Sequence, residues 1–421
     1  MWRNKLTKDG YYIIIVTEKR EIAMVIRERY LRLIRPFYNQ ELIKVLVGIR
    51  RSGKSVILKQ IMDELRKNDV NDNHIIYINF EDYDYEEYTD PKKLNDYIKE
   101  KIVDDKKYYI FFDEIQNVNR WEKVVNSLRA TKNTSIFITG SNSDLLSGDL
   151  ATHIAGRYVS FRVTPFTFDE VCNLLNITDK RDIEDTFNDY VKWGGMPQRF
   201  MQQDDISKKT YLTDIYDSIM IKDIVKRFNI KDIDLLTRIV TYILTTPSQV
   251  FSPDSLKKYM QSESRNVSLE TLYNYLDYIV RANLISKVER YDVRGKRILT
   301  GKYKYYLTDL GFTNILSEGR REQIGSYLEN IVYNELIARG YKVNIGTLEN
   351  GEIDFVATRF NEKIYIQVAY ILNDESVINR EFNAYKKIED NYPKYVISMD
   401  KFDLSRDGII HKNVIDWLLD K

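Results

Sequence analysis

Apolar residues in the first part of the chain follow two alternating periods. Five mostly apolar runs predict buried strands: residues 43–47, 74–80, 108–112, 135–139 and 158–163. Between these runs apolar residues recur every three or four positions, which predicts amphipathic helices. Strands that alternate with helices are typical of a parallel sheet covered on both faces. We therefore expect an α/β domain over residues 24–165, preceded by an N-terminal extension, residues 1–23, that shows no matching pattern.

The periodicity changes after residue 165. Residues 166–228 lose the strand signal and predict helices, interrupted by the turn Gly194-Gly195-Met196-Pro197. Residues 229–315 predict three helices and then a hairpin, which is the order of a winged helix. Residues 316–421 return to a pattern of helix and strands. We expect these three segments to form a helical lid, a winged helix and a C-terminal α/β domain, in that order.

The loop after the first predicted strand, Gly48–Ser55, reads GIRRSGKS and fits the P-loop pattern G-x-x-x-x-G-K-[ST] at every fixed position. Its glycines let successive backbone N–H groups converge on phosphates, while Lys54 supplies a positive charge and Ser55 a hydroxyl for Mg²⁺. The motif predicts ATP and Mg²⁺ as cofactors. The predicted nucleotide contacts in this segment are Gly48, Ile49, Arg50, Arg51, Ser52, Gly53, Lys54, Ser55 and Val56.

A second motif closes the third predicted strand, where YYIFF is followed by Asp113 and Glu114. This is a Walker B pattern. We expect Asp113 to hold Mg²⁺, and Glu114, as the next residue of a strand, to point elsewhere and to position or deprotonate the attacking water. Two acids at a strand end can also simply begin a turn, but the P-loop in the same domain favours the catalytic interpretation.

Polar residues follow the fourth predicted strand at Ser141 and Asn142. Ligands of doubly wound sheets bind at the carboxyl ends of the strands, so we favour a sensor of the γ-phosphate here over a plain helix cap. Arg157 precedes the fifth strand. It reaches a phosphate, in its own or a neighbouring subunit, or it is an ordinary surface residue.

Composition sets further bounds. The 64 lysines and arginines nearly cancel the 63 aspartates and glutamates, so attraction to a nucleic acid has to come from a local patch. The single cysteine, Cys172, excludes an intramolecular disulfide and a cysteine zinc cluster, and fits a reducing compartment. No apolar run approaches the roughly 20 residues that cross a bilayer. We expect a cytoplasmic protein without a membrane partner.

Six motifs together carry a resemblance to a known family. They are GIRRSGKS at 48–55, FE at 80–81, FDEIQ at 112–116, TGSN at 139–142, AGR at 155–157 and GGMP at 194–197. The set resembles the archaeal and bacterial AAA+-like ATPases related to the STAND group, from Met24 to the C-terminus. The resemblance implies a sensor 1 element at Gly140–Asn142, a functional arginine at Arg157 and a nucleotide contact at Pro197.

Basic residues gather in and near the predicted hairpin of the winged helix. They are Arg290, Arg294, Lys296, Arg297, Lys302 and Lys304. A local basic patch of this kind favours contact with double-stranded DNA. The exposed face of the third helix, over 268–282, is mixed instead of basic, so a protein partner or a second copy of the chain stands as the alternative.

Members of the same family often end in a PD-(D/E)XK nuclease-like domain, and residues 316–421 resemble it. Glu329 and Asp354 fit its first two metal ligands. The third position reads Gln367-Val368-Ala369, so a neutral amide replaces an acid and a methyl group replaces the lysine. Lys386 or Lys387 offers a replacement cation. We expect a degenerate site without nuclease activity.

Three functional hypotheses follow. The first is an Mg²⁺-dependent ATPase that binds and hydrolyses ATP between core and lid and thereby rearranges the winged-helix and nuclease-like domains, acting on DNA or a DNA-associated partner. The second is a nucleotide-gated DNA-binding or regulatory scaffold with little turnover, and the third is an ATP-regulated endonuclease. Glu114 favours the first over the second, and Ala369 argues against the third.

Overall fold

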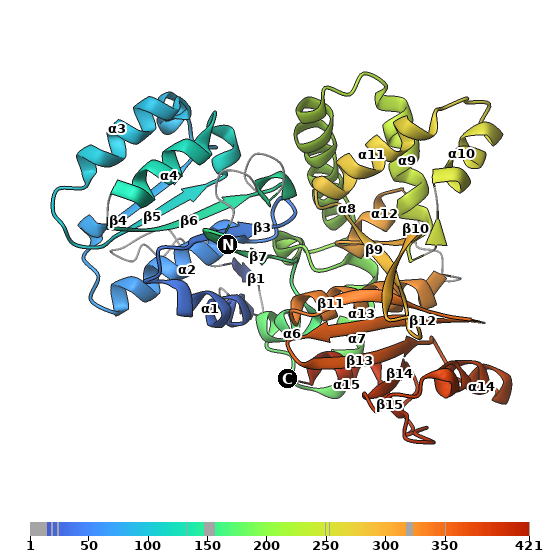
Figure 1. Cartoon of the computed structure of the whole chain (residues 1–421). Helices are drawn as coiled ribbons and strands as arrows, with labels where there is room; N and C mark the ends of the chain where they lie inside the picture. Colours follow the sequence, from blue (N-terminus) through green and yellow to red (C-terminus); the bar gives the residue numbers. More distant parts are fainter. Residues whose placement is uncertain are drawn as a thin grey trace. The chain divides into compact units, whose positions relative to one another are not determined.

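The computed structural model describes residues 15–17, 20–22, 25–131, 133–146, 156–248, 250–251, 253–316, 323–349 and 351–420. The chain divides into two compact units (Figure 1). The P-loop unit comprises Val25–Pro165 together with Arg281–Asn283. The C-terminal unit comprises Phe166–Val280 and Leu284–Lys421, with Met1–Met24 assigned to it as well. Ile15–Thr17 (β1) and Arg20–Ile22 (β2) pair with each other as antiparallel strands.

The P-loop unit is built on a parallel sheet of five strands. They are β3 (Ile43–Val47), β4 (Ile75–Asn79), β5 (Tyr108–Asp113), β6 (Thr134–Gly140) and β7 (Tyr158–Arg162). Their order in the sheet is β4-β5-β6-β3-β7, and every neighbouring pair is parallel. Because β5, β6 and β3 are adjacent and parallel, the loops that follow them leave the sheet at the same edge. This confirms an α/β P-loop core.

Two helices cover each face of this sheet (Figure 1). They are α1 (Glu28–Ile34) and α2 (Lys54–Lys67) on one face, and α3 (Pro91–Lys101) and α4 (Trp121–Thr131) on the other. Side chains of β5 alternate between the two layers: Phe111 packs toward α2, whereas Ile110 and Phe112 pack toward α3 and α4. Burial of both faces explains why the strands read as nearly continuous apolar runs.

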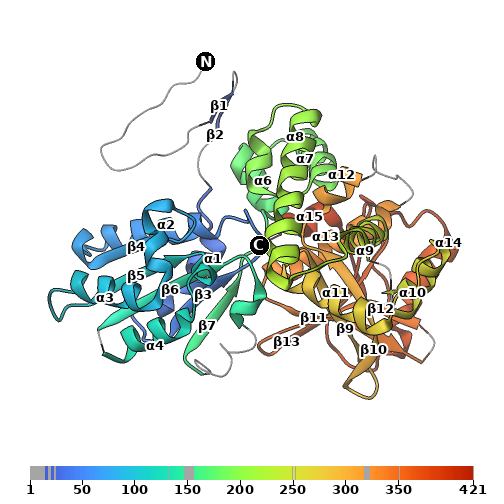
Figure 2. The same ribbon diagram turned by 90° about the horizontal axis from the view of Figure 1, so that it is seen from above.

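The C-terminal unit begins with helices. They are α6 (Phe168–Leu175), α7 (Lys180–Trp193), α8 (Asp205–Ser218), a π-helical continuation (Ile219–Lys226), α9 (Ile233–Thr245), α10 (Pro253–Ser262) and α11 (Leu269–Arg281). A capping box between Thr167 and Glu170 starts α6, which packs against α7 (Figure 2). The first part of the C-terminal unit is therefore helical.

A mixed sheet of eight strands forms the rest of this unit. The strands are β8 (Val250–Phe251), β9 (Ile285–Asp292), β10 (Arg297–Leu307), β11 (Lys342–Leu348), β12 (Gly351–Arg359), β13 (Glu362–Val368), β14 (Lys394–Ser398) and β15 (Ile410–Asn413). Their order is β15-β14-β13-β12-β11-β9-β10-β8. The hairpin β9–β10 therefore continues into the C-terminal strands, because β9 pairs in parallel with β11.

Further helices of the C-terminal unit follow or interrupt this sheet. They are α12 (Thr313–Leu316), α13 (Ile324–Ala338), α14 (Glu375–Asn383) and α15 (Val414–Leu419). Helix α13 packs against β10, β11, β12 and β13, so it spans both the hairpin and the C-terminal strands. A search of the described residues finds no helix with the length and apolar character of a membrane span.

Candidate functional site

The P-loop adopts a backbone that its glycines permit. Gly53 has a φ of 98°, in the left-handed region, immediately before α2 begins at Lys54. A side chain at Gly48 would place its Cβ 2.1 Å from the carbonyl oxygen of Val163, so only glycine fits there. The Oγ atom of Ser52 is buried and has no hydrogen-bond partner among the described residues. A curled loop with an unsatisfied hydroxyl at a helix N-terminus fits an anion such as phosphate.

Lys54 lies inside this loop and is 3% exposed. Its ammonium group donates hydrogen bonds to the carbonyl oxygens of Gly48 at 3.0 Å and Ile49 at 3.1 Å. The carboxylate of Glu114 lies 3.7 Å from the same ammonium group. The positive charge of the P-loop and the acid that follows β5 thus belong to one cluster.

Asp113, the last residue of β5, is buried and held by two hydroxyl groups. Tyr77 donates to its Oδ2 atom at 2.9 Å, and Thr139 donates to its Oδ1 atom. The fixed carboxylate, together with the hydroxyl of Ser55 at the start of α2, is a suitable donor set for Mg²⁺ because both are hard oxygen ligands. The metal assignment to Ser55 and Asp113 remains a prediction.

Glu114 leaves the strand instead of continuing it. Strand β5 ends at Asp113, and Glu114 has a φ of 53° in the left-handed region, which is uncommon for residues other than glycine. Its backbone N–H donates to Thr139 Oγ1 at 2.9 Å, and its carboxylate accepts from Gln116 Nε2. The turn, and not strand alternation, therefore sets the direction of this side chain. A 3-10 turn, Ile115–Asn117, follows, and helix α4 starts at Trp121.

Charge keeps Glu114 ionised despite its burial. Burial alone raises the pKa of a carboxyl group, but the positive charge of Lys54, the hydrogen bond from Gln116 and the charge of Arg50 outweigh it. The pKa of Glu114 is therefore lowered from its ordinary value. A carboxylate in this state orients water by accepting a hydrogen bond at neutral pH.

The other residues predicted to contact the nucleotide differ in how deeply they are buried. Ser141 and Asn142, after β6, are fully buried, and the carbonyl oxygen of Ser141 accepts from Asn283 at 3.1 Å within the P-loop unit. Arg50 pairs with Glu81 at 2.7 Å. Arg157 is exposed before β7, and its carbonyl oxygen accepts from the N–H of Ile43, so the structure leaves its side chain accessible.

Arg27 is a residue that sequence reasoning missed. It is 1% exposed and donates from Nη1 to the carbonyl oxygen of Ser52 at 3.1 Å and from Nη2 to that of Thr164 at 3.1 Å. Its guanidinium also lies 4.7 Å from the ring centre of Tyr30. This side chain holds the P-loop backbone through the hydrogen bond to Ser52 and places a buried positive charge next to the loop. Nothing in the local sequence pattern distinguishes Arg27 from the surface arginines around it.

The turn Gly194–Pro197 is shaped by contacts within the C-terminal unit. A Cβ at Gly195 would lie 2.1 Å from the carbonyl oxygen of Phe166, and one at Gly194 would lie 1.7 Å from a carboxylate oxygen of Asp309. Asp309 accepts from the N–H groups of Gly195 at 2.7 Å and Gly311 at 2.8 Å. These contacts explain the two glycines by packing. The nucleotide contact of Pro197 stays a prediction.

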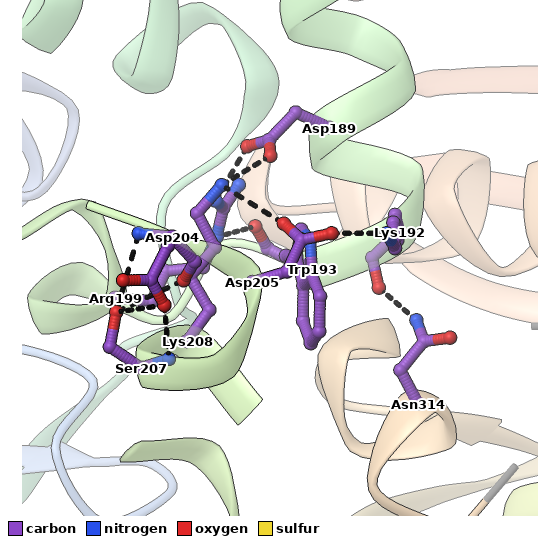
Figure 3. Close-up of polar contacts among 10 residues, drawn as sticks. Asp189, Lys192, Trp193, Arg199, Asp204, Asp205, Ser207, Lys208 and Asn314 are labelled. Atoms are coloured by element: carbon purple, nitrogen blue, oxygen red, sulfur yellow. Dashed lines mark hydrogen bonds and ion pairs between the residues drawn. The ribbon is translucent and has the colours of Figure 1, made fainter. Parts of the chain in front are cut away.

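A polar network surrounds the same turn (Figure 3). Arg199, buried after Pro197, donates to the carbonyl oxygen of Gly194 at 2.6 Å and pairs with Asp189 of α7 at 2.7 Å. Lys208 of α8 reaches Asp189 at 2.6 Å. Helices α7 and α8 are thereby joined through one carboxylate, which holds the turn between them in place.

Asp309 makes the contribution of this region to the free energy of unfolding depend on pH. Burial raises its pKa to about 6, although the N–H groups that it accepts from favour the ionised form. The unfolded carboxyl group loses its proton near pH 4, whereas the folded one keeps it up to about pH 6. The contribution of Asp309 to stability is therefore full below pH 4 and falls by about 2–3 kcal/mol as the pH rises to 6.

We expect this fall to be absent in Asp309→Asn, when urea unfolding of both proteins is compared between pH 4 and 7. Asp189→Asn is the matched control, because the charge of Arg199 outweighs burial and lowers the pKa of Asp189. The stability of the parent relative to that control should rise with pH. A pH-independent difference between the parent and Asp309→Asn would contradict the assignment.

The predicted nuclease-like residues come together in the C-terminal unit. Glu329 on α13 and Asp354 on β12 lie on either side of Lys304, which forms ion pairs of 3.1 Å and 3.7 Å with them. The Oε1 atom of Gln367 accepts the backbone N–H of Asp354 at 3.1 Å. The suggested replacement cations, Lys386 and Lys387, are exposed on a 3-10 turn. Sequence reasoning had assigned Lys304 to the basic hairpin instead.

Several basic residues of the hairpin are already paired inside the C-terminal unit. Arg290 pairs with Glu352 at 2.7 Å, Arg294 with Glu349 at 3.3 Å and Arg297 with Asp292 at 3.7 Å. The side chain of Lys302 lies outside the described ones. The pairs of Arg294 and Arg297 are exposed and therefore weak, so these two residues and the exposed Lys296 are the accessible part of the patch.

Two family models match consecutive parts of the chain. Residues 40–172 match the family described as "AAA domain", and residues 184–323 match a "Domain of unknown function (DUF8612)". A solved structure, the Walker-type ATPase PABY2304 of Pyrococcus abyssi, is 15% identical with a TM-score of 0.49, covering 70% of this chain and 96% of that one.

Two relatives extend over most of the chain. An uncharacterised protein of Haemophilus influenzae is 37% identical over 400 residues, which is 94% of this chain and 99% of that protein. An uncharacterised protein of Methanocaldococcus jannaschii is 32% identical over 357 residues, which is 82% of this chain and 78% of that protein. The chain belongs to the family of these two proteins, and residues 40–172 form a P-loop core of the AAA+ type.

Proposed function

We propose that this protein is an Mg²⁺-dependent ATPase whose P-loop unit binds and hydrolyses ATP. The observation that carries the proposal is the position of Lys54, which lies within the P-loop and 3.7 Å from the carboxylate of Glu114. A charge for phosphate and an ionised acid for water are the two protein groups that hydrolysis of the γ-phosphate requires next to each other. The AAA domain match supports the same activity.

Each residue then has a defined task. The N–H groups of the P-loop and the ammonium of Lys54 bind the phosphates. These groups are preorganised, because Gly48, Gly53 and Arg27 fix the conformation of the loop. Ser55 and Asp113 would hold Mg²⁺, which supplies charge neutralisation at the phosphate oxygens when it is bound. Glu114 accepts a hydrogen bond from the attacking water and orients it.

We propose that the C-terminal unit converts this activity into a change in what the protein binds. In this interpretation residues 166–228 act as a lid, residues 229–315 as a winged helix, and residues 316–421 as a nuclease-like domain without nuclease activity. The continuous sheet through β9 and β11 supports a joint movement of the last two segments. The alternative function, a regulatory scaffold with little turnover, would use the same parts and differ from the proposed ATPase only in its rate of ATP hydrolysis.

Phosphate release from ATP by the full chain tests the ATPase proposal. We expect steady release that requires Mg²⁺ and stops with a chelator, with a kcat on the order of 0.01–10 s⁻¹, since P-loop proteins range from slow switches to faster motors. Tight ATP binding without phosphate release over hours would instead favour the scaffold.

DNA binding is the proposed role of the accessible basic residues in the hairpin. We expect the slope of log affinity for duplex DNA against log salt concentration to become less steep by about 2–3 in the triple variant Arg294→Ala, Lys296→Ala, Arg297→Ala. Each lost phosphate contact removes about 0.9 from this slope. Fluorescence anisotropy between 50 and 300 mM salt measures this.

The matched control for DNA binding is the double variant Lys386→Ala and Lys387→Ala, which removes two exposed lysines of the same unit. Its salt slope should equal that of the parent. An unchanged slope in the triple variant, or no duplex binding by the parent, would assign the hairpin to a protein partner or to a second copy of the chain.

A further inference from the structure

Three carboxylates of the C-terminal unit converge on one buried lysine. The ammonium of Lys304 lies 2.6 Å from Glu352, 3.1 Å from Glu329 and 3.7 Å from Asp354. Lys304 comes from β10, Glu329 from α13, and Glu352 and Asp354 from β12, so three separate elements meet at its charge. Only 8% of the Lys304 side chain is exposed, which means that solvent screens these ion pairs weakly.

Other groups complete the hydrogen bonding of the acids. Tyr306 donates to Glu329 at 2.6 Å, Arg290 to Glu352 at 2.7 Å, and the backbone N–H of Val368 to Asp354 at 2.8 Å. The side-chain oxygen of Gln367, which stands where the nuclease pattern has an acid, is used by a backbone N–H. Each of the three carboxylates and the side-chain amide of Gln367 thus already accepts a hydrogen bond from a donor of the chain itself.

The electrostatics of the cluster agree with this arrangement. Burial alone lowers the pKa of Lys304, but the negative charges of Glu329, Asp354 and Glu352 outweigh it and raise that pKa, so the lysine remains charged. Burial and the charge of Glu329 raise the pKa of Asp354. Two cations, Lys304 and Arg290, thus face the three carboxylates of the cluster. No group of acids, histidines or cysteines able to hold a metal ion is found among the described residues.

We propose that Lys304 is a built-in cation that takes the place of a divalent metal between Glu329, Glu352 and Asp354, and that removal of its ammonium group opens a divalent-cation site. This inference concerns only the C-terminal unit and does not depend on the proposed ATPase activity. It assigns the cluster a structural task, because the lysine joins the hairpin strand β10 to α13 and β12 through a single buried charge.

The position of Lys304 in its strand makes displacement by a metal unfavourable. The residue is paired on one side with Val288 of β9 and on the other with Val250 of β8, so its backbone is fixed within the sheet. A divalent ion added to the parent would have to expel the ammonium from three carboxylates while also leaving it without a partner. Leaving one charge of a buried ion pair unpaired is strongly destabilising.

Binding of Mn²⁺ to the full chain, measured by the loss of the free-ion EPR signal without nucleotide, tests the proposal. The parent should show no Mn²⁺ binding that depends on Asp354. Lys304→Ala should bind about one Mn²⁺ per chain with at least tenfold higher affinity than the parent, and Lys304→Ala combined with Asp354→Asn should lose it again. Lys363→Ala is the matched control, because Asp390 is the one acid that pairs with Lys363 among the described residues, and removal of Lys363 should create no site.

Two outcomes would overturn the proposal: a folded Lys304→Ala that gains no Mn²⁺ site, and a parent whose Mn²⁺ binding disappears in Asp354→Asn. The second comparison uses only a conservative change, so it remains decisive if the lysine variant fails to fold. Lys304→Met provides an independent measurement. Its thermal midpoint should fall by roughly 5–15 °C, because three half-buried carboxylates lose the buried cation between them, whereas an unchanged midpoint would also contradict the proposed role.

Discussion

Glu114→Gln is expected to reduce the rate of ATP hydrolysis by about 10²–10⁴-fold while leaving nucleotide bound. The change keeps the size of the side chain and removes the negative charge that accepts a hydrogen bond from water. Binding should persist because the P-loop and Lys54 are intact, and because Lys54 keeps its bonds to the carbonyl oxygens of Gly48 and Ile49. A fluorescent ATP analogue and a phosphate-release assay measure the two properties separately.

The control for this variant is Glu86→Gln, which removes a charge from an exposed residue in the acidic segment after β4. Its hydrolysis rate should match that of the parent. Full turnover by Glu114→Gln would show that another group orients the water, and Gln116, which donates to Glu114, would then be the first residue to replace.

Lys54→Ala is expected to weaken ATP binding by roughly 10²-fold or more, which corresponds to about 3 kcal/mol. The ammonium group is the charge within the P-loop, and its hydrogen bonds to phosphate oxygens would be charge-assisted. The substitution also removes the partner of Glu114, whose pKa should then rise, because the charge of Lys54 is the largest influence that opposes burial. Hydrolysis should be lost together with binding.

Lys59→Ala, an exposed lysine one turn further along α2, is the matched control and should bind ATP like the parent. Circular dichroism must show that Lys54→Ala keeps its helices. ATP affinity equal to that of the parent in a folded Lys54→Ala would mean that the loop does not hold the phosphates.

The core of the fold follows from local patterns in the sequence. Consecutive apolar runs mark the five parallel strands, and the P-loop and Walker B motifs place Lys54 and Asp113 after β3 and β5, the two strands that flank β6 in the sheet. These features are predictable because each depends on residues close together in the chain. The direction of Glu114 is not, since it depends on a left-handed turn whose N–H is bound by Thr139 of the next strand.

The residues that sequence reasoning missed act through long-range contacts. Arg27 supports Ser52 and also reaches Thr164, far along the chain, so no spacing rule marks it. Glu352 shares a face of β12 with Asp354 at a separation of two, a pattern that could have identified it. Lys304 looks like one more basic residue of the hairpin, and only the pairing of β9 with β11 brings it toward the acids of the C-terminal segment.

The most direct measurement of the central claim is a single-turnover experiment with radiolabelled ATP, in which the protein is in excess and Mg²⁺ starts the reaction. The parent should convert bound ATP to ADP and phosphate in one exponential phase. Glu114→Gln should retain ATP unchanged over the same period, and Lys54→Ala should bind none of it. Parent protein that holds ATP through many such periods without forming ADP would contradict hydrolysis at this site.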